Sequence, residues 1–264
     1  MTQASNAIQA YNNALSVHSA NIANMSVPGY KRLNVSFQSI FENILNGGTA
    51  ASPFDNLGGT NPTQFGQGVA ISNIGIDMSD GATTQSNTID LAIQGRGLFI
   101  VSNDGGSTYQ YTRAGSFAVS SAGRLVTQAG MQVYGLDSNG SITPITGLTG
   151  ASADYSWNSG TGELLLNGSS TGYRIALTYF PNSSGLAQAS GTTFIETLAS
   201  GSAASPQTVG GAAGSVTAGS IEQSNVFYLG ETIDSLEIQR AMSGNLTVVR
   251  MASDIISNFI SKLG

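Results

Sequence analysis

The sequence predicts an α+β protein in which a coiled-coil helix at each end of the chain flanks a mainly β, glycine-rich middle. Apolar residues recur at helical spacing near both termini, and the long middle has almost no such pattern. Short apolar runs separated by glycines fill that middle instead. We therefore expect an N-terminal coiled-coil helix (1–28), an extended linker or β-hairpin region (29–75), a β-rich central domain (76–220) and a C-terminal coiled-coil helix (221–264).

The N-terminal helix is predicted by apolar residues at alternating steps of four and three, the a/d spacing of a coiled coil. The pattern stops at Val27, because Pro28 disfavours helix at the residue before it and Gly29 accepts a turn. We therefore expect the helix to end by about Val27. The repeat consists of Ala4, Ile8, Tyr11, Leu15, His18, Ile22 and Met25.

The C-terminal helix shows the same rhythm over a longer stretch. We expect it to begin near Val226, with Ser224 or Asn225 as its cap, because both residue types favour the N-cap position. Gly244 lies inside it at a cost of about 1 kcal/mol relative to Ala, which suggests close packing or a bend. A separate stripe upstream contains Leu229, Ile233 and Leu236, and the main repeat contains Ile238, Met242, Asn245, Val249, Ala252, Ile256, Phe259 and Leu263.

Periodicity alone leaves two interpretations open. The two helices either cover one globular core, or meet each other and further copies of the chain in an assembly. The second interpretation fits the position of both repeats at the chain ends, because long isolated helices gain most of their stability from packing. It names an assembly interface formed by Ile8, Tyr11, Leu15, Ile22, Met25, Ile238, Met242, Val249, Ile256, Phe259 and Leu263.

The middle of the chain has short strand candidates with glycine at nearly every joint, where Gly and Asn accept the positive φ that tight turns need. The Gly/Ala/Ser-rich stretch 200–219 resembles a flexible return to the last helix, and 46–59 an extended linker or loop. The strand candidates are 98–101, 109–111, 116–119, 124–127, 131–134, 162–166 and 173–180.

Composition excludes several functions. Charged residues make up 9% of the chain against roughly 25% in an ordinary domain, and the net charge of −6 opposes nucleic-acid binding. The absence of cysteine excludes disulfides and thiolate chemistry. We expect neither a cleavable signal peptide nor membrane insertion, because the first basic residue is Lys31 and every apolar run is short.

Two sequence patterns resemble catalytic or nucleotide-binding motifs. Gly95-Arg96-Gly97 follows an apolar run, but Ile100 stands where a dinucleotide-binding loop has its third glycine. Residues 168–172 match a nucleophile elbow around Ser170, yet the single histidine, His18, lies in the helical repeat with no acidic partner nearby in sequence. We therefore expect no catalytic residue, no cofactor and no metal, and interpret the Ser170 segment as a turn.

Several charged side chains remain as candidates for binding. The carboxylates Asp77, Asp80, Asp90 and Asp104 have no recognisable calcium or glycosidase spacing, so we interpret them as solvated loop acids. Arg113 lies beside a predicted turn, where a structural hydrogen-bond donor is the favoured interpretation over a functional cation.

Six segments in order along the chain resemble the flagellar hook and rod protein family. The first is an asparagine-rich helix end that runs into a Pro-Gly-Tyr-Lys turn, and the last two are the family's closing motifs. They are ANIANMSVPGYK (20–31), DLAIQGRGLFIV (90–101), YTRAGSF (111–117), GRLVT (123–127), IEQSNV (221–226) and QRAMSGN (239–245).

The resemblance implies a structural subunit of the bacterial flagellum rather than an enzyme. Such proteins form a hollow tube, with the terminal helices in an inner layer around an export channel and β domains outside. The implied partners are copies of the chain, other axial proteins (rod, hook cap and hook–filament junction) and the flagellar type III export apparatus. The implied location is the hook or basal body, extracellular or periplasm-spanning, after export without signal-peptide cleavage.

Within the family, residues 58–68 and 74–77 resemble hook proteins more than rod proteins. The short chain suits either a distal rod or a compact hook without an outer domain. We expect a hook subunit, a flexible joint that transmits torque, with a rigid distal-rod subunit as the alternative. More distant alternatives are a secreted adhesin or fibre subunit and, last, a hydrolase that uses Ser170.

Overall fold

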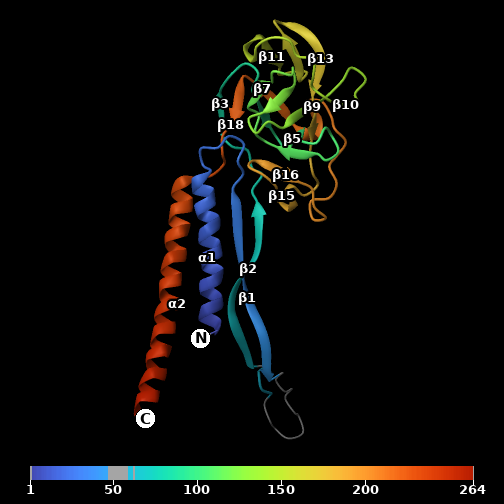
Figure 1. The fold of residues 1–264 in the computed structure, drawn as a ribbon. Coiled ribbons are helices and arrows are strands. Elements are labelled where there is room, and N and C mark those ends of the chain that lie inside the picture. Colours follow the sequence, from blue (N-terminus) through green and yellow to red (C-terminus); the bar gives the residue numbers. More distant parts are fainter. Residues whose placement is uncertain (1, 47–58, 62, 264) are drawn as a thin grey trace. The chain divides into compact units, whose positions relative to one another are not determined.

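The computed structural model describes residues 2–46, 59–61 and 63–263, which form two compact units (Figure 1). The first unit combines both chain ends with residues 34–74, and the second combines residues 21–33 with 75–227. Helices at the ends and a β-rich middle confirm the predicted α+β class. In the described residues, no helix is both long and apolar enough to cross a bilayer.

The first unit contains helix α1 (Thr2–Ala23), helix α2 (Tyr228–Leu263) and the paired strands β1 (Leu33–Asn46) and β2 (Thr63–Ile76). Figure 1 shows α1 beside α2 on one side and beside the strand pair on the other. The rings of Tyr11 in α1 and Phe37 in β1 meet edge-to-face, with centroids 5.7 Å apart. A Cβ on Gly68 would lie 3.2 Å from the Gln3 carbonyl oxygen, so β2 runs close to the α1 backbone.

The ends of both helices differ slightly from the prediction. Helix α1 stops at Ala23, and turns closed by backbone bonds such as Val27 N–H to Asn24 O lead to Gly29. Helix α2 begins at Tyr228, and Asn225 does not act as the expected cap. Its side-chain amide instead donates to the carbonyl of Asp77. Asn225 therefore connects two loops just before the helix begins.

Residues 29–75, for which we predicted an extended linker or β-hairpin region, include most of the long strands β1 and β2, which pair with each other. The predicted loop 46–59 lies mostly outside the described residues, because the structure describes none of 47–58.

The second unit is built on antiparallel strands, and in its described residues the main sheet has 12 of them, in the path β11-β12-β13-β9-β5-β6-β16-β15 with β7, β8, β10 and β14 attached. Every predicted strand segment overlaps an observed strand, and the predicted segment 173–180 is divided between the end of β13 and β14. The strands are β3 Thr83–Gln85, β4 Leu91–Gln94, β5 Leu98–Ser102, β6 Gln110–Thr112, β7 Phe117–Val119, β8 Leu125–Thr127, β9 Gln132–Leu136, β10 Ile142–Pro144, β11 Tyr155–Asn158, β12 Glu163–Leu166, β13 Ser169–Ile175, β14 Leu177–Thr178, β15 Ala187–Gln188, β16 Thr193–Ile195, β17 Ser215–Ala218 and β18 Ser220–Glu222.

The core of this unit lies on both faces of β5. Phe99 and Val101 belong to one buried cluster, whereas Leu98 and Ile100 belong to a second. Because strand side chains alternate between faces, a continuous apolar run in β5 requires cover on both sides. In the first cluster the Trp157 Nε1–H donates to the Ile89 carbonyl at 2.6 Å, which satisfies the polar atom of a buried indole.

The flexible return predicted over 200–219 is wrong for its second half. Strand β17 pairs with β4, with Val216 opposite Ile93, and Val216 is buried. Gly214, just before β17, is required because two backbone segments approach each other closely: a Cβ at this position would lie 2.1 Å from the Gln94 carbonyl oxygen. Composition therefore suggested flexibility where the chain in fact needs backbone-to-backbone contact.

Candidate assembly interface

The predicted α1 repeat lies next to, rather than on, the most buried stripe of the helix. Ile8, Tyr11, Leu15 and Ile22 are half-buried, and Met25 lies beyond the helix end and is 40% exposed. The side chains that α1 buries fully toward its neighbours are mostly small: Ala4, Ala7, Ala10, Ala14, His18 and Asn21. Alanine lets a neighbouring backbone approach closely, and the larger residues beside this stripe keep part of their apolar surface accessible.

The predicted α2 repeat becomes progressively more exposed toward the C-terminus. Ile238 is buried, Met242 and Val249 are half-buried, and Ile256 and Phe259 are 49% and 66% exposed. Leu263 ends the helix, and its side chain lies outside the described residues. That these residues contact other copies of the chain stays a prediction.

Helix α2 exposes more apolar residues than the predicted repeat contains. Sequence reasoning missed Ile255 and Ile260, which are 68% and 66% exposed. They lie outside the predicted heptad positions, because the exposed apolar residues near the helix end occupy more than one heptad stripe. The other exposed apolar side chains of α2 are Tyr228, Leu229, Ile233, Leu236, Leu246, Val248 and Met251.

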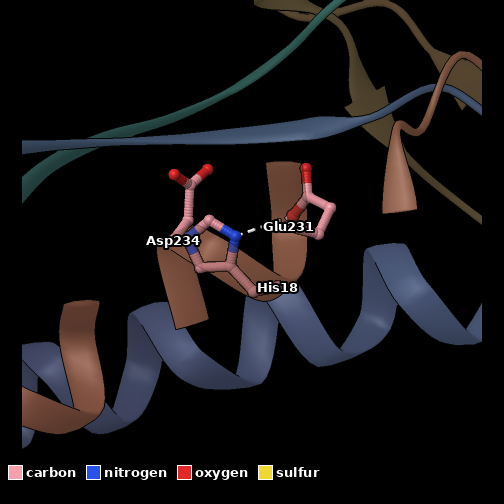
Figure 2. Close-up of side chains that lie close together, drawn as sticks. All are labelled: His18, Glu231 and Asp234. Carbon is pink, nitrogen blue, oxygen red and sulfur yellow. Dashed lines mark hydrogen bonds and ion pairs between the residues drawn. The ribbon is translucent and has the colours of Figure 1, made fainter. Parts of the chain in front are cut away.

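His18 has an acidic partner that sequence distance concealed. Its Nδ1 lies 2.7 Å from Oε2 of Glu231, which is 213 residues away on α2, and both side chains are buried. Figure 2 shows that the side chain of Asp234, one helical turn further along α2, lies close to those of His18 and Glu231. The three side chains place their potential ligand atoms within 4.8 Å of one another. The pair joins the two terminal helices.

In the second unit, distant motifs meet at a buried ion cluster. Lys31 Nζ lies 2.6 Å from Glu222 Oε1 and donates to the Ser79 carbonyl at 2.6 Å. Arg113 Nη1 lies 3.1 Å from Glu222 Oε2 and 3.2 Å from Asp80 Oδ1. Burial lowers the pKa of Lys31, although the Glu222 carboxylate opposes this shift. Arg113 is thus a structural donor, as expected, and Glu222 links three of the six motifs.

Two residues of the Asn-rich motif at 20–31 have clear structural roles. Gly29 has φ of +72°, and a Cβ there would lie 2.3 Å from the Ala114 backbone nitrogen, so this turn excludes larger residues. The Asn21 side chain donates to the Leu33 carbonyl at 2.9 Å and accepts from the Leu33 N–H at 3.0 Å. The motif therefore fixes the path of the chain immediately after α1.

The residues considered for catalysis have structural roles. Ser170 lies in strand β13 rather than on a strand-to-helix turn, and its Oγ donates to Glu163. Asp90 is buried, which corrects the expectation of a solvated acid, and accepts hydrogen bonds from Ser86 Oγ at 2.6 Å and Phe117 N–H at 3.0 Å. Asp104 is exposed; hydrogen bonds, first from Ser102, lower its pKa.

Two protein-family models match this chain, one at its N-terminus and one within the β domain. The family model for flagella basal body rod protein matches residues 1–31, and the model for the flagellar hook protein FlgE/F/G D1 domain matches residues 92–152. The flagellar basal-body rod protein FlgG of Bacillus subtilis (strain 168) is 32% identical over 251 residues, which is 94% of this chain and 92% of the relative.

Two other relatives differ in how much they share with this chain. FlgG of Caulobacter vibrioides is 32% identical over 91% of this chain and 90% of its own length. The flagellar hook protein FlgE of Treponema pallidum is 40% identical, but over 48% of this chain and 27% of its own length. With its paired terminal helices and motif-linked β domain, this chain belongs to the flagellar hook and basal-body rod family and is a structural, non-enzymatic subunit of the flagellar axis.

Proposed function

We propose that this chain is a rod subunit, the rigid drive shaft of the basal body, rather than the hook subunit favoured by residues 58–68 and 74–77. The observation that carries the proposal is the coverage of the relatives. Two rod proteins match it over at least 90% of both chains, whereas the hook protein of Treponema pallidum matches about half of this chain and 27% of its own.

The arrangement within the first unit supports a stiff subunit. Strands β1 and β2 have 14 residues each and pair with each other, and both contact α1 through side-chain or backbone approaches. A paired strand ribbon braced on a helix resists bending better than a single extended chain. A drive shaft needs such locked contacts, whereas a flexible joint needs contacts that slide.

Under this proposal the chain forms a hollow helical polymer with copies of itself and adjoins other axial proteins. The exposed apolar end of α2 supports this, because a large unpartnered apolar surface on one element marks an interaction site. The family resemblance further implies passage through the flagellar type III export apparatus with the N-terminus retained, and a position in the basal body.

The experiment is the bending stiffness of fibres assembled from the purified chain. Electron micrographs of many fibres give the distribution of curvature, and its width gives the stiffness. We expect straight fibres with a narrow curvature distribution. Curved or supercoiled fibres that change shape under flow would instead support the hook, and failure to polymerise at high concentration would contradict the polymer itself.

A further inference from the structure

We propose that His18, Glu231 and Asp234 form a binding site for a divalent transition-metal ion, with Zn²⁺ as the representative ion, that ties helix α1 to helix α2. The site is a property of the monomer and holds whether the polymer is a rod or a hook. All three residues belong to the first compact unit, so they lie within one packed body.

The residue types suit such an ion. One imidazole nitrogen and two carboxylate oxygens are ligands that Zn²⁺ accepts, and a site with three protein ligands keeps a further position for water or another group. The imidazole favours a transition metal over Ca²⁺ and Mg²⁺, which prefer oxygen ligands alone. With a neutral imidazole the two carboxylates carry two negative charges, which one divalent cation balances.

The backbone already places the ligands correctly. Glu231 and Asp234 are three residues apart on α2, so they share one helix face, and His18 approaches that face from α1 (Figure 2). Two ligands of a tetrahedral zinc ion with bonds near 2.1 Å lie about 3.4 Å apart. The Nδ1–Oε2 distance of 2.7 Å lies below this value, and the limit of 4.8 Å for the whole group lies above it. Binding therefore requires the side chains to rotate, with the backbone of both helices in place.

The surroundings favour binding over solvation. The side chains of His18 and Glu231 are 8% and 1% exposed, so water competes little for the cation. Burying a charged or polar pair is costly unless its charges are compensated. A bound cation compensates the charges of both carboxylates at once. Because the ligands come from both ends of the chain, binding also stabilises the pairing of α1 with α2.

The chain offers an unusually specific probe of this site. His18 is its single histidine and it has no cysteine, so any imidazole signal in an untagged preparation comes from this residue. We would strip the full-length protein with a chelator and titrate it with Zn²⁺ by calorimetry. In parallel, Co²⁺ absorption in the visible range and the ¹⁵N shifts of the histidine ring report direct coordination.

We expect one Zn²⁺ per chain, a change in the His18 ring ¹⁵N shifts and a visible Co²⁺ band typical of low coordination number. Loss of outer-shell partners weakens metal binding about 10–100-fold, so loss of a ligand in Asp234→Asn should weaken it at least about 10-fold. His18→Gln should abolish the band. The matched control is Asp254→Asn, the same change at an exposed position of α2, which should bind as wild type does.

Asp234 is half-buried, so its variant tests the site even where changing His18 disturbs folding. Absence of binding to the wild type would overturn the proposal. So would equal Zn²⁺ affinity for the wild type and Asp234→Asn, or binding that leaves the His18 ring shifts unchanged, since either places the metal elsewhere.

Discussion

The β domain buries its large apolar side chains, whereas the C-terminal half of α2 exposes many of its own. In the domain, Phe99 and Leu125 are fully buried, and the polar atom of Trp157 has a partner. In α2 beyond Gly244, Ile255 and Phe259 are 68% and 66% exposed. The domain therefore contains the interactions that stabilise its own fold, whereas the end of α2 has apolar surface that a further packing partner would cover. Folding and assembly should be separable by mutation.

The largest effect should follow from placing charges on the exposed end of α2. The double variant Ile256→Asp and Phe259→Asp should lose polymerisation, because an assembled interface would bury two unpaired carboxylates. Its β domain should unfold at the wild-type temperature. Sedimentation measures the polymer, and thermal unfolding measured by circular dichroism reports the domain.

The matched control adds the same two charges in the same turn at polar, exposed positions, as Ser257→Asp and Asn258→Asp. We expect this control to keep most of the polymer. Equal loss in both double variants would mean that charge alone, rather than the apolar surface, governs assembly.

A smaller, local effect should follow from removing the charge at the centre of the ion cluster. Glu222→Gln leaves Lys31 and Arg113 buried without their common carboxylate, so the free energy of unfolding should fall by about 3–5 kcal/mol. Denaturant unfolding of unpolymerised protein measures this change.

The control for that cluster is Glu196→Gln, an exposed carboxylate of the same unit, which should change stability by less than about 0.5 kcal/mol. A similarly small effect of Glu222→Gln would mean that the three motifs around Lys31, Arg113 and Glu222 are held together mainly by backbone contacts and apolar packing.

The smallest effect concerns pH. Burial raises the pKa of Tyr111 to about 12, with the Glu196 charge as a lesser cause. The unfolded chain, with a tyrosine pKa near 10, loses this proton first, so stability should fall as pH rises from about 10 toward 12. Lys31 has the opposite sign, because its lowered pKa makes stability rise with pH toward about 10.5.

Comparing wild type with Tyr111→Phe between pH 9 and 12 isolates the tyrosine contribution, since Lys31 is common to both. The variant should lose less stability over this range in denaturant titrations. Tyr228→Phe, at an exposed position of α2, should keep the wild-type slope. An unchanged slope in Tyr111→Phe would contradict the assigned burial effect.

Local signals predicted most of the elements. The helical repeats placed both helices within a few residues, and each predicted strand was found, because turn glycines and apolar runs act over short distances. The exceptions share one cause. Residues 215–218 form β17 because they pair with β4, a partner that local composition does not reveal. Predicted seam residues such as Ile8 proved half-buried for the same reason, since the neighbouring alanines face the packing partner.

The sequence by itself determined the fold class, the family and the apolar repeat of the last helix, because periodicity and ordered motifs are written in local residue patterns. Tertiary structure alone decided that Glu231 meets His18, and that Glu222 joins Lys31 to Arg113. These contacts join residues that lie 109 to 213 positions apart in the sequence. Which distant charges pair depends on how whole helices and sheets pack. The spacing of residues along the chain does not reveal how far apart two side chains lie in the folded protein.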